Sequence, residues 1–113
     1  MASGSQGVNV PEMINRLITE NKVMVFSKSY CPYCLDAKDL LDELNIVYKV
    51  IELDQDPLGY VIQQTLSDMT GQWTVPNIFI NGTSIGGCDD LNALHIKGKL
   101  EEMVAVARKR EAS

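Results

Sequence analysis

Apolar residues recur along this chain with two different periods, and these periods predict its helices and strands. Apolar positions three and four residues apart predict helices over 11–21, 32–45, 57–70, 89–98 and 100–106. Short runs rich in β-branched residues predict strands over 22–27, 47–53, 76–80 and 83–86. The predicted order is helix, strand, helix, strand, helix, strand, strand, helix, helix.

Turn and capping residues predict where several of these elements begin and end. Asn81-Gly82 predicts a type I′ hairpin turn, because both central residues of that turn need a positive φ. Asp56 is expected to cap a helix whose first residue is Pro57. Gly86-Gly87 should break the sheet before a helix opened by Asp89-Asp90. Basic residues over 108–110 favour the end of the last helix.

The order of the elements predicts an α/β fold. The first strand, its following helix and the second strand should form a parallel pair with a right-handed crossover. We therefore expect a four-stranded mixed β-sheet flanked by five helices, in a single domain over 10–113 after a flexible tail at 1–9. Cys31 falls between the first strand and its crossover helix, where open α/β sheets bind ligands.

Composition and charge narrow the classes of function. With 113 residues, 45% hydrophobic and 22% charged, the chain is expected to form one globular domain. A net charge of −5 opposes binding to nucleic acid or to an anionic membrane, and the apolar runs are too short to cross a bilayer. Residues 1–7 do not resemble a secretory signal, so a reducing cytoplasm is the expected location.

Two of the three cysteines, Cys31 and Cys34, lie three positions apart at the predicted start of a helix. Unpaired amides and the helix dipole stabilise a thiolate there, and Pro32 suits the first turn because it has no N–H to leave unsatisfied. Cys34 can donate its S–H to that thiolate or close a disulfide with it. A stabilised thiolate is also a good leaving group, so Cys31 suits a catalyst whose own disulfide is broken repeatedly.

Two other interpretations of these cysteines stay open on the pattern alone. Both could be small buried apolar residues with no chemical role. Alternatively, Cys31, Cys34, Cys88 and His95 could bind zinc, although the spacing of the second pair is unusual for such a site.

Three motifs in this order resemble the dithiol glutaredoxin family: Ser27-Lys-Ser-Tyr-Cys-Pro-Tyr-Cys34, Gln72-Trp-Thr-Val-Pro76 and Gly86-Gly-Cys-Asp-Asp90. The resemblance, which covers about 11–108, implies a thioredoxin-like fold and a monomeric, glutathione-dependent thiol-disulfide oxidoreductase. It implies that Cys31 is the nucleophile that reduces glutathione mixed disulfides, and that Cys34 is needed in addition for protein disulfides. Glutathione is then the co-substrate, glutathionylated or disulfide-containing proteins are the partners, and no metal is expected.

The same resemblance implies a glutathione site formed by Lys28, Tyr33, Gln72, Thr74, Val75, Pro76, Gly87, Cys88 and Asp89. Lys28 and Gln72 match positions that bind the glycine-end carboxylate. The Val75-Pro76 bond is expected to be cis, so that Val75 pairs with the glutathione backbone. The amides of Cys88 and Asp89 match the γ-glutamyl carboxylate, and the Asp89 carboxylate matches its ammonium group. Such local contacts would overcome the unfavourable net charge.

Several of these residues have plainer alternatives. Lys28 could be a solvated surface lysine, Tyr33 could cover apolar surface, and Asp89 could serve as an N-cap. Trp73 is expected either at an apolar rim that contacts protein substrates or packed on the preceding helix. Cys88 either offers only its backbone amide or exposes a reactive thiol.

Two alternative functions also follow. Some members of the family carry a [2Fe-2S] cluster bridged by two chains and two glutathiones, which here would use Cys31, but Pro32 disfavours this because it restricts the backbone. The other alternative is a thioredoxin-like enzyme reduced by a protein reductase. The segment over 86–90 argues against it, because its clear purpose is to hold a γ-glutamyl group.

Overall fold

A computed structural model describes residues 8–106 and confirms the predicted order of helices and strands. The elements are α1 (Val10–Glu20), β1 (Val23–Ser27), α2 (Pro32–Glu43), β2 (Lys49–Glu52), α3 (Gly59–Thr70), β3 (Asn77–Ile80), β4 (Thr83–Gly86), α4 (Cys88–Ile96) and α5 (Leu100–Ala105). None of the described helices is long and apolar enough to span a membrane.

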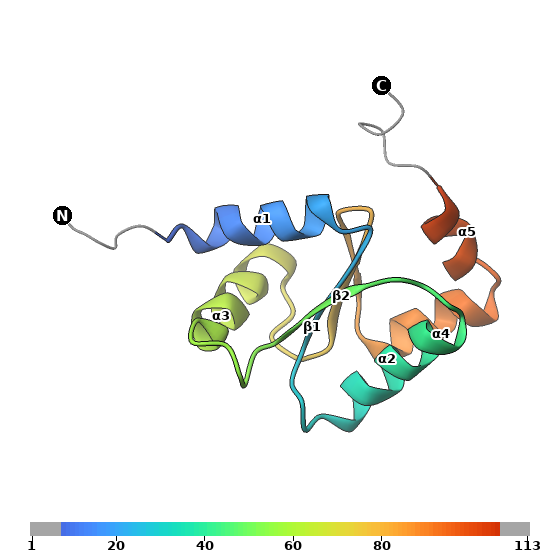
Figure 1. Cartoon of the computed structure of the whole chain (residues 1–113), viewed down its shortest axis with the longest axis horizontal. Coiled ribbons are helices and arrows are strands. Elements are labelled where there is room, and N and C mark those ends of the chain that lie inside the picture. The colour runs from blue at the N-terminus through green and yellow to red at the C-terminus, as the bar shows by residue number, and fades with distance from the viewer. Residues whose placement is uncertain (1–7, 107–113) are drawn as a thin grey trace.

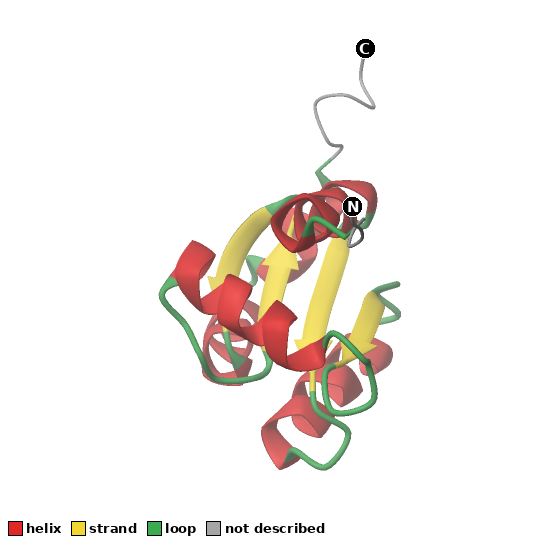
Figure 2. Ribbon diagram, turned by 90° about the vertical axis from the view of Figure 1, so that its left-hand side faces the viewer, coloured by secondary structure: helices red, strands yellow, loops and turns green. Residues whose placement is uncertain are grey.

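The strands form the predicted four-stranded mixed sheet, in the order β2-β1-β3-β4. β1 pairs in parallel with β2 and antiparallel with β3, and β3 pairs antiparallel with β4. The helices cover both faces of the sheet (Figures 1 and 2). α1 and α3 pack together on one face, and α2, α4 and α5 lie on the other.

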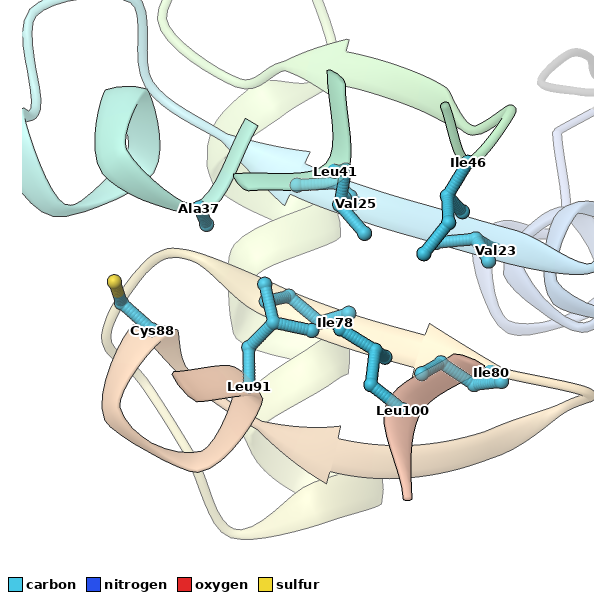
Figure 3. Packing of buried hydrophobic residues seen from close by; sticks show 10 residues of the cluster. All are labelled: Val23, Val25, Ala37, Leu41, Ile46, Ile78, Ile80, Cys88, Leu91 and Leu100. Atoms are coloured by element: carbon cyan, nitrogen blue, oxygen red, sulfur yellow. The ribbon is translucent and has the colours of Figure 1, made fainter. Parts of the chain in front are cut away.

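β1 is buried along its whole length because it lies inside the sheet with a core on each face. Successive side chains of a strand point to opposite faces. Val23 and Val25 therefore enter the core under α2, α4 and α5, whereas Met24 and Phe26 enter the core under α1 and α3. Figure 3 shows the first of these cores, with Cys88 at one end of the cluster. This continuous burial explains why β1 reads as an unbroken apolar run.

Two asparagines with positive φ mark chain reversals, and one of them confirms a predicted turn. Asn81 and Gly82 both have positive φ, 53° and 81°, as the predicted hairpin turn between β3 and β4 requires. Asn45, with φ 57°, lies just beyond the end of α2 in the left-handed conformation that often ends a helix.

Two predicted helix starts are wrong. Asp56 does not cap a helix at Pro57: it accepts the Leu58 N–H through its side chain (2.8 Å) and the Gly59 N–H through its carbonyl (2.9 Å). Both acceptors thus close a turn ahead of α3, which begins only at Gly59. α4 begins at Cys88 and not at Asp89-Asp90, because Gly87 occupies the N-cap position.

Most of the predicted tail at 1–9 and all of the predicted basic helix end at 108–110 lie outside the residues that the structure describes. Residues 1–7 and 108–110 lie outside the described residues. Asn9, which the sequence places in the tail, caps α1 by accepting the Glu12 N–H through its side chain (3.1 Å).

Gly59 provides a stability test of the contact between the start of α3 and Leu53, the residue after β2. A Cβ at Gly59 would lie 1.7 Å from the Leu53 carbonyl oxygen, so we expect Gly59→Ala to cost about 3 kcal/mol or more of unfolding free energy. Gly71→Ala is the matched control: its φ is 79° but the space around it is open, so it should cost about 1 kcal/mol. Urea unfolding of both variants measures the difference, and equal losses would contradict this packing.

Candidate active site

An open groove of about 470 Å³ brings together the three sequence motifs. Its lining residues are Tyr33, Gln72, Thr74, Val75, Pro76, Gly87, Cys88, Asp89 and Asp90. Tyr33 comes from the first turn of α2, residues 72–76 form the loop between α3 and β3, and residues 87–90 form the start of α4. Of the predicted glutathione-binding residues, only Lys28 does not line this groove.

Cys31 occupies the N-cap position of α2, as the sequence predicts, and Pro32 follows at the first helical position. The Cys31 Sγ accepts the N–H of Cys34 (3.4 Å), one of the amides that a helix start leaves unpaired. On its other side, Sγ lies 3.8 Å from the Val75 carbonyl oxygen. The half-buried sulfur therefore combines a helix end that stabilises a thiolate with a position beside the groove.

Cys34 is fully buried behind Cys31. Burial raises the pKa of the Cys34 thiol to about 11, since it penalises the charged form, and the neighbouring Cys31 adds to the rise. Hydrogen bonds from the Lys28 backbone and the Ser27 hydroxyl lower this pKa but do not cancel the effect of burial. At neutral pH Cys34 is therefore a protonated thiol, while Cys31 is the accessible sulfur.

A contact between Ser29 and Asp54 fixes the turn that carries Cys31. The Asp54 carboxylate accepts the Ser29 N–H (2.9 Å) and also the Ser29 hydroxyl. These bonds hold the pKa of Asp54 below its usual value, and the bond from the hydroxyl has the largest effect. Within the turn, the Cys31 N–H donates to the Lys28 carbonyl (3.1 Å). Asp54 thereby anchors Ser29, which lies inside the turn that this bond closes.

Sequence reasoning missed this contact, although the sheet register explains it. The parallel pairing of β1 with β2 places Ser27 beside Glu52. Two residues further along each chain come Ser29 and Asp54. The predicted parallel pairing of the first two strands was therefore the signal for this contact. Using it requires the register of that pairing, which the apolar pattern alone does not supply.

The loop over 72–76 has the predicted cis bond between Val75 and Pro76. Side-chain amides hold its carbonyl groups. The Gln72 Nε2 donates to the carbonyls of Thr74 (3.0 Å) and Pro76 (3.0 Å). The structure therefore places this predicted ligand of a carboxylate against its own loop.

Gln63 is a second residue that sequence reasoning missed. It lies on α3, is 6% exposed, and donates from Nε2 to the Trp73 carbonyl (2.8 Å). Its helical neighbours Ile62 and Leu66 belong to the core under α1 and α3. A polar side chain on the apolar face of a helix needs a hydrogen-bond partner, and this was the available signal.

The start of α4 offers polar groups to the groove. Gly87 at the N-cap has no side chain to accept the amides of the first turn. Its own N–H donates to the Asp90 carboxylate (2.9 Å), so Asp90, and not Asp89, makes the capping bond. Gly86 has φ 107°, and a Cβ there would lie 2.2 Å from that carboxylate. Asp89 is exposed, and its side chain makes no hydrogen bond within residues 8–106.

Cys88 is buried at the start of α4, whereas Trp73 packs on α3 and stays partly exposed. Cys88 is 7% exposed, and its pKa is raised by burial and then by the charges of Asp36 and Asp89. An exposed reactive thiol is therefore the wrong alternative for Cys88.

Trp73 packs edge-on against Tyr60 of α3, with ring centres 6.0 Å apart, yet it stays 46% exposed. Trp73 therefore packs on the preceding helix, as one alternative predicts, and its remaining surface is exposed outside the lining of the groove.

The zinc interpretation finds no matching geometry. Among residues 8–106, no group of three or more His, Cys, Asp or Glu side chains is arranged to hold a metal ion. Cys31, Cys34, Cys88 and His95 therefore do not form the cluster of ligands that a zinc site needs.

Comparisons with known proteins agree with this geometry. The family model described as Glutaredoxin matches residues 23–85. A glutaredoxin of Ricinus communis is 52% identical over 91 residues, covering 80% of this chain and 89% of that protein. Glutaredoxin-1 of Rhizophagus irregularis is 50% identical over 96 residues, covering 85% of this chain and 95% of that protein. The buckwheat glutaredoxin–glutathione complex has a TM-score of 0.83 at 46% identity, covering 84% of this chain and 86% of that chain. The fold is the predicted thioredoxin-like one.

Alkylation rates test the difference between the two motif cysteines. A pKa of about 11 leaves roughly one Cys34 in a thousand as thiolate at pH 8, so iodoacetamide should modify Cys31 at least about 100-fold faster. The Cys34 rate should then rise about tenfold per pH unit as the pH approaches 11. Peptide mass spectrometry measures both rates. Cys34 should stay slow in Cys31→Ser, because burial is the main cause, and comparable rates for both sulfurs would contradict this arrangement.

The contact between Ser29 and Asp54 predicts an acid-stable turn. Because the folded pKa of Asp54 is lowered, the bonds stabilise the fold above the usual value of 3.8 and are lost only as the pH falls through the lower folded value. The Ser29 amide resonance should report a midpoint below pH 3.8. Ser29→Ala removes the hydroxyl that donates to Asp54, which is the larger cause of its lowered pKa. The Asp54 carboxyl resonance of this variant should therefore titrate at a higher pH than in the parent protein. Identical Asp54 midpoints in both proteins would contradict the contact.

Proposed function

Because this chain belongs to the glutaredoxin family and is a thiol-disulfide oxidoreductase, we propose that it uses glutathione to reduce glutathione mixed disulfides through Cys31 and protein disulfides through Cys31 with Cys34. The observation that carries the proposal is the position of the Cys31 sulfur. It accepts an amide at the start of α2 and lies 3.8 Å from the Val75 carbonyl, beside a groove lined by both other motifs.

Reduction of a glutathione mixed disulfide needs only Cys31. Its thiolate attacks the glutathione sulfur, the disulfide breaks, and the protein leaves as a thiolate that takes up a proton. A second glutathione thiolate then attacks the glutathione sulfur bound to Cys31. This forms oxidised glutathione and expels the Cys31 thiolate, which the start of α2 stabilises as a leaving group.

Reduction of a protein disulfide uses both cysteines. The Cys31 thiolate attacks one sulfur of the substrate and forms a mixed disulfide. Cys34 then loses its proton and attacks the Cys31 sulfur, which releases the reduced protein and leaves a disulfide between Cys31 and Cys34. Two glutathiones reduce that disulfide and become oxidised glutathione. The high pKa of Cys34, about 11, keeps this second sulfur protonated until it is needed.

The groove supports glutathione as the co-substrate. The Asp89 carboxylate has no partner among the described residues and suits the γ-glutamyl ammonium, while the amides at the start of α4 suit its carboxylate. The Val75 backbone is the proposed partner of the cysteine residue of glutathione. Lys28 is the proposed partner of the carboxylate at its glycine end. A similar protein, the buckwheat glutaredoxin, was solved as a glutathione complex.

Single substitutions of the two cysteines test these roles. Cys31→Ser should abolish turnover of both substrate classes, since it removes the nucleophile. Cys34→Ser, its matched control, should retain at least about a third of the mixed-disulfide activity but lose protein-disulfide reduction by about 100-fold or more. Glutathione-coupled assays of a small mixed disulfide and of a disulfide-bonded protein measure the split. Equal losses for both variants with the mixed disulfide would overturn the assignment.

A further inference from the structure

Gln72 is the first residue of the loop over 72–76 that forms one wall of the groove, and its side chain turns back onto the rest of that loop. Its Nε2 donates to the Thr74 carbonyl (3.0 Å) and to the Pro76 carbonyl (3.0 Å). A primary amide has two N–H donors, so both are used inside the protein. The side chain keeps only an acceptor oxygen, which repels a carboxylate.

The two carbonyls that Gln72 holds are those on either side of the Val75 carbonyl. That middle carbonyl is the one that faces the Cys31 sulfur, at 3.8 Å. Holding the peptide groups before and after the Val75-Pro76 peptide fixes the direction of the Val75 carbonyl between them. Gln72 therefore controls the backbone that the proposed function assigns to glutathione.

Other polar groups hold the ends of the same loop. The Gln72 N–H donates to the Thr70 Oγ1 (3.1 Å), and the buried Asn77 Nδ2 donates to the same oxygen (3.3 Å). One hydroxyl at the end of α3 thus joins the two sides of the loop. With these ends held, Gln72 provides the bonds that span the interior of the loop.

We propose that Gln72 is a positioning residue, which promotes glutathione binding by holding the loop over Thr74 to Pro76 and does not contact the glycine-end carboxylate. This inference deepens the proposed function and rests on it, because it concerns the same groove. The sequence suggests two residues, Lys28 and Gln72, for the glycine-end carboxylate of glutathione. Of these two, only Lys28 then contacts that carboxylate.

A substrate without the glycine-end charge separates contact from positioning. We would compare mixed disulfides of a small thiol with glutathione and with glutathione ethyl-esterified at glycine. Gln72→Met keeps the length of the side chain but removes both donors, and it should lower kcat/KM about tenfold for both substrates. The loss should fall on KM, with kcat retained, because Cys31 is not affected. A loss confined to the unesterified substrate would show direct contact and overturn the proposal.

Two further variants serve as controls. Lys28→Met should lose activity mainly with the unesterified substrate, because its proposed role is contact with the charge. Gln55→Met should change neither substrate, since its exposed side chain makes no hydrogen bond within residues 8–106. If the parent protein turns over neither of the two glutathione mixed disulfides, the proposed function fails. The position of the loop over 72–76 is then tested by a measurement that does not use glutathione.

Trp73 supplies that measurement, because it is the only tryptophan of the chain and lies inside the loop. In the free protein, Gln72→Met should increase acrylamide quenching of Trp73 fluorescence by about half or more, while Lys28→Met and Gln55→Met leave it unchanged. Unaltered quenching in Gln72→Met would overturn the positioning role even if the glutathione assays show a loss.

Discussion

The pairing of β1 with both its neighbours is the constraint on which the site depends. The antiparallel register places Phe26 opposite Asn77, so the turn after β1 and the loop before β3 emerge side by side. This is why the Cys31 sulfur meets the Val75 carbonyl. The parallel register with β2 brings Asp54 to Ser29 at the same edge. A slip of one residue in either pairing would move both cores to the wrong face and separate these groups.

Burial and helix position give the two cysteines of one motif opposite properties. Cys31 lies before the first turn of α2, where an unpaired amide meets its sulfur. Cys34 lies one turn later on the face that packs into the protein, where charge is unfavourable. The difference arises because Cys31 lies outside the helix, at the N-cap beside the groove, whereas Cys34 lies inside the helix on its buried face. No additional charged residue is needed to distinguish them.

Sequence patterns predicted the parts of the structure that depend on one segment at a time. The apolar run from Val23 to Phe26, the Asn81-Gly82 turn and the position of Cys31 before a helix are all properties of short stretches. The missed features join segments. Asp54 reaches Ser29 only through strand pairing, and Gln63 reaches Trp73 only through the packing of α3. Asp56 failed as a cap because it completes a turn instead, a choice that local preference does not distinguish.

The central place of β1 also divides the molecule by its rates of opening. Its amides lie between two strands and two cores, so they should exchange with solvent only when the whole domain unfolds. The turn after Ser27 and the loop before Asn77 are held instead by a few side-chain bonds and should open far more often. The reactive sulfur thus lies on a turn held by two hydrogen bonds to Asp54, and the amides of that turn should exchange sooner than those of the strand that carries it.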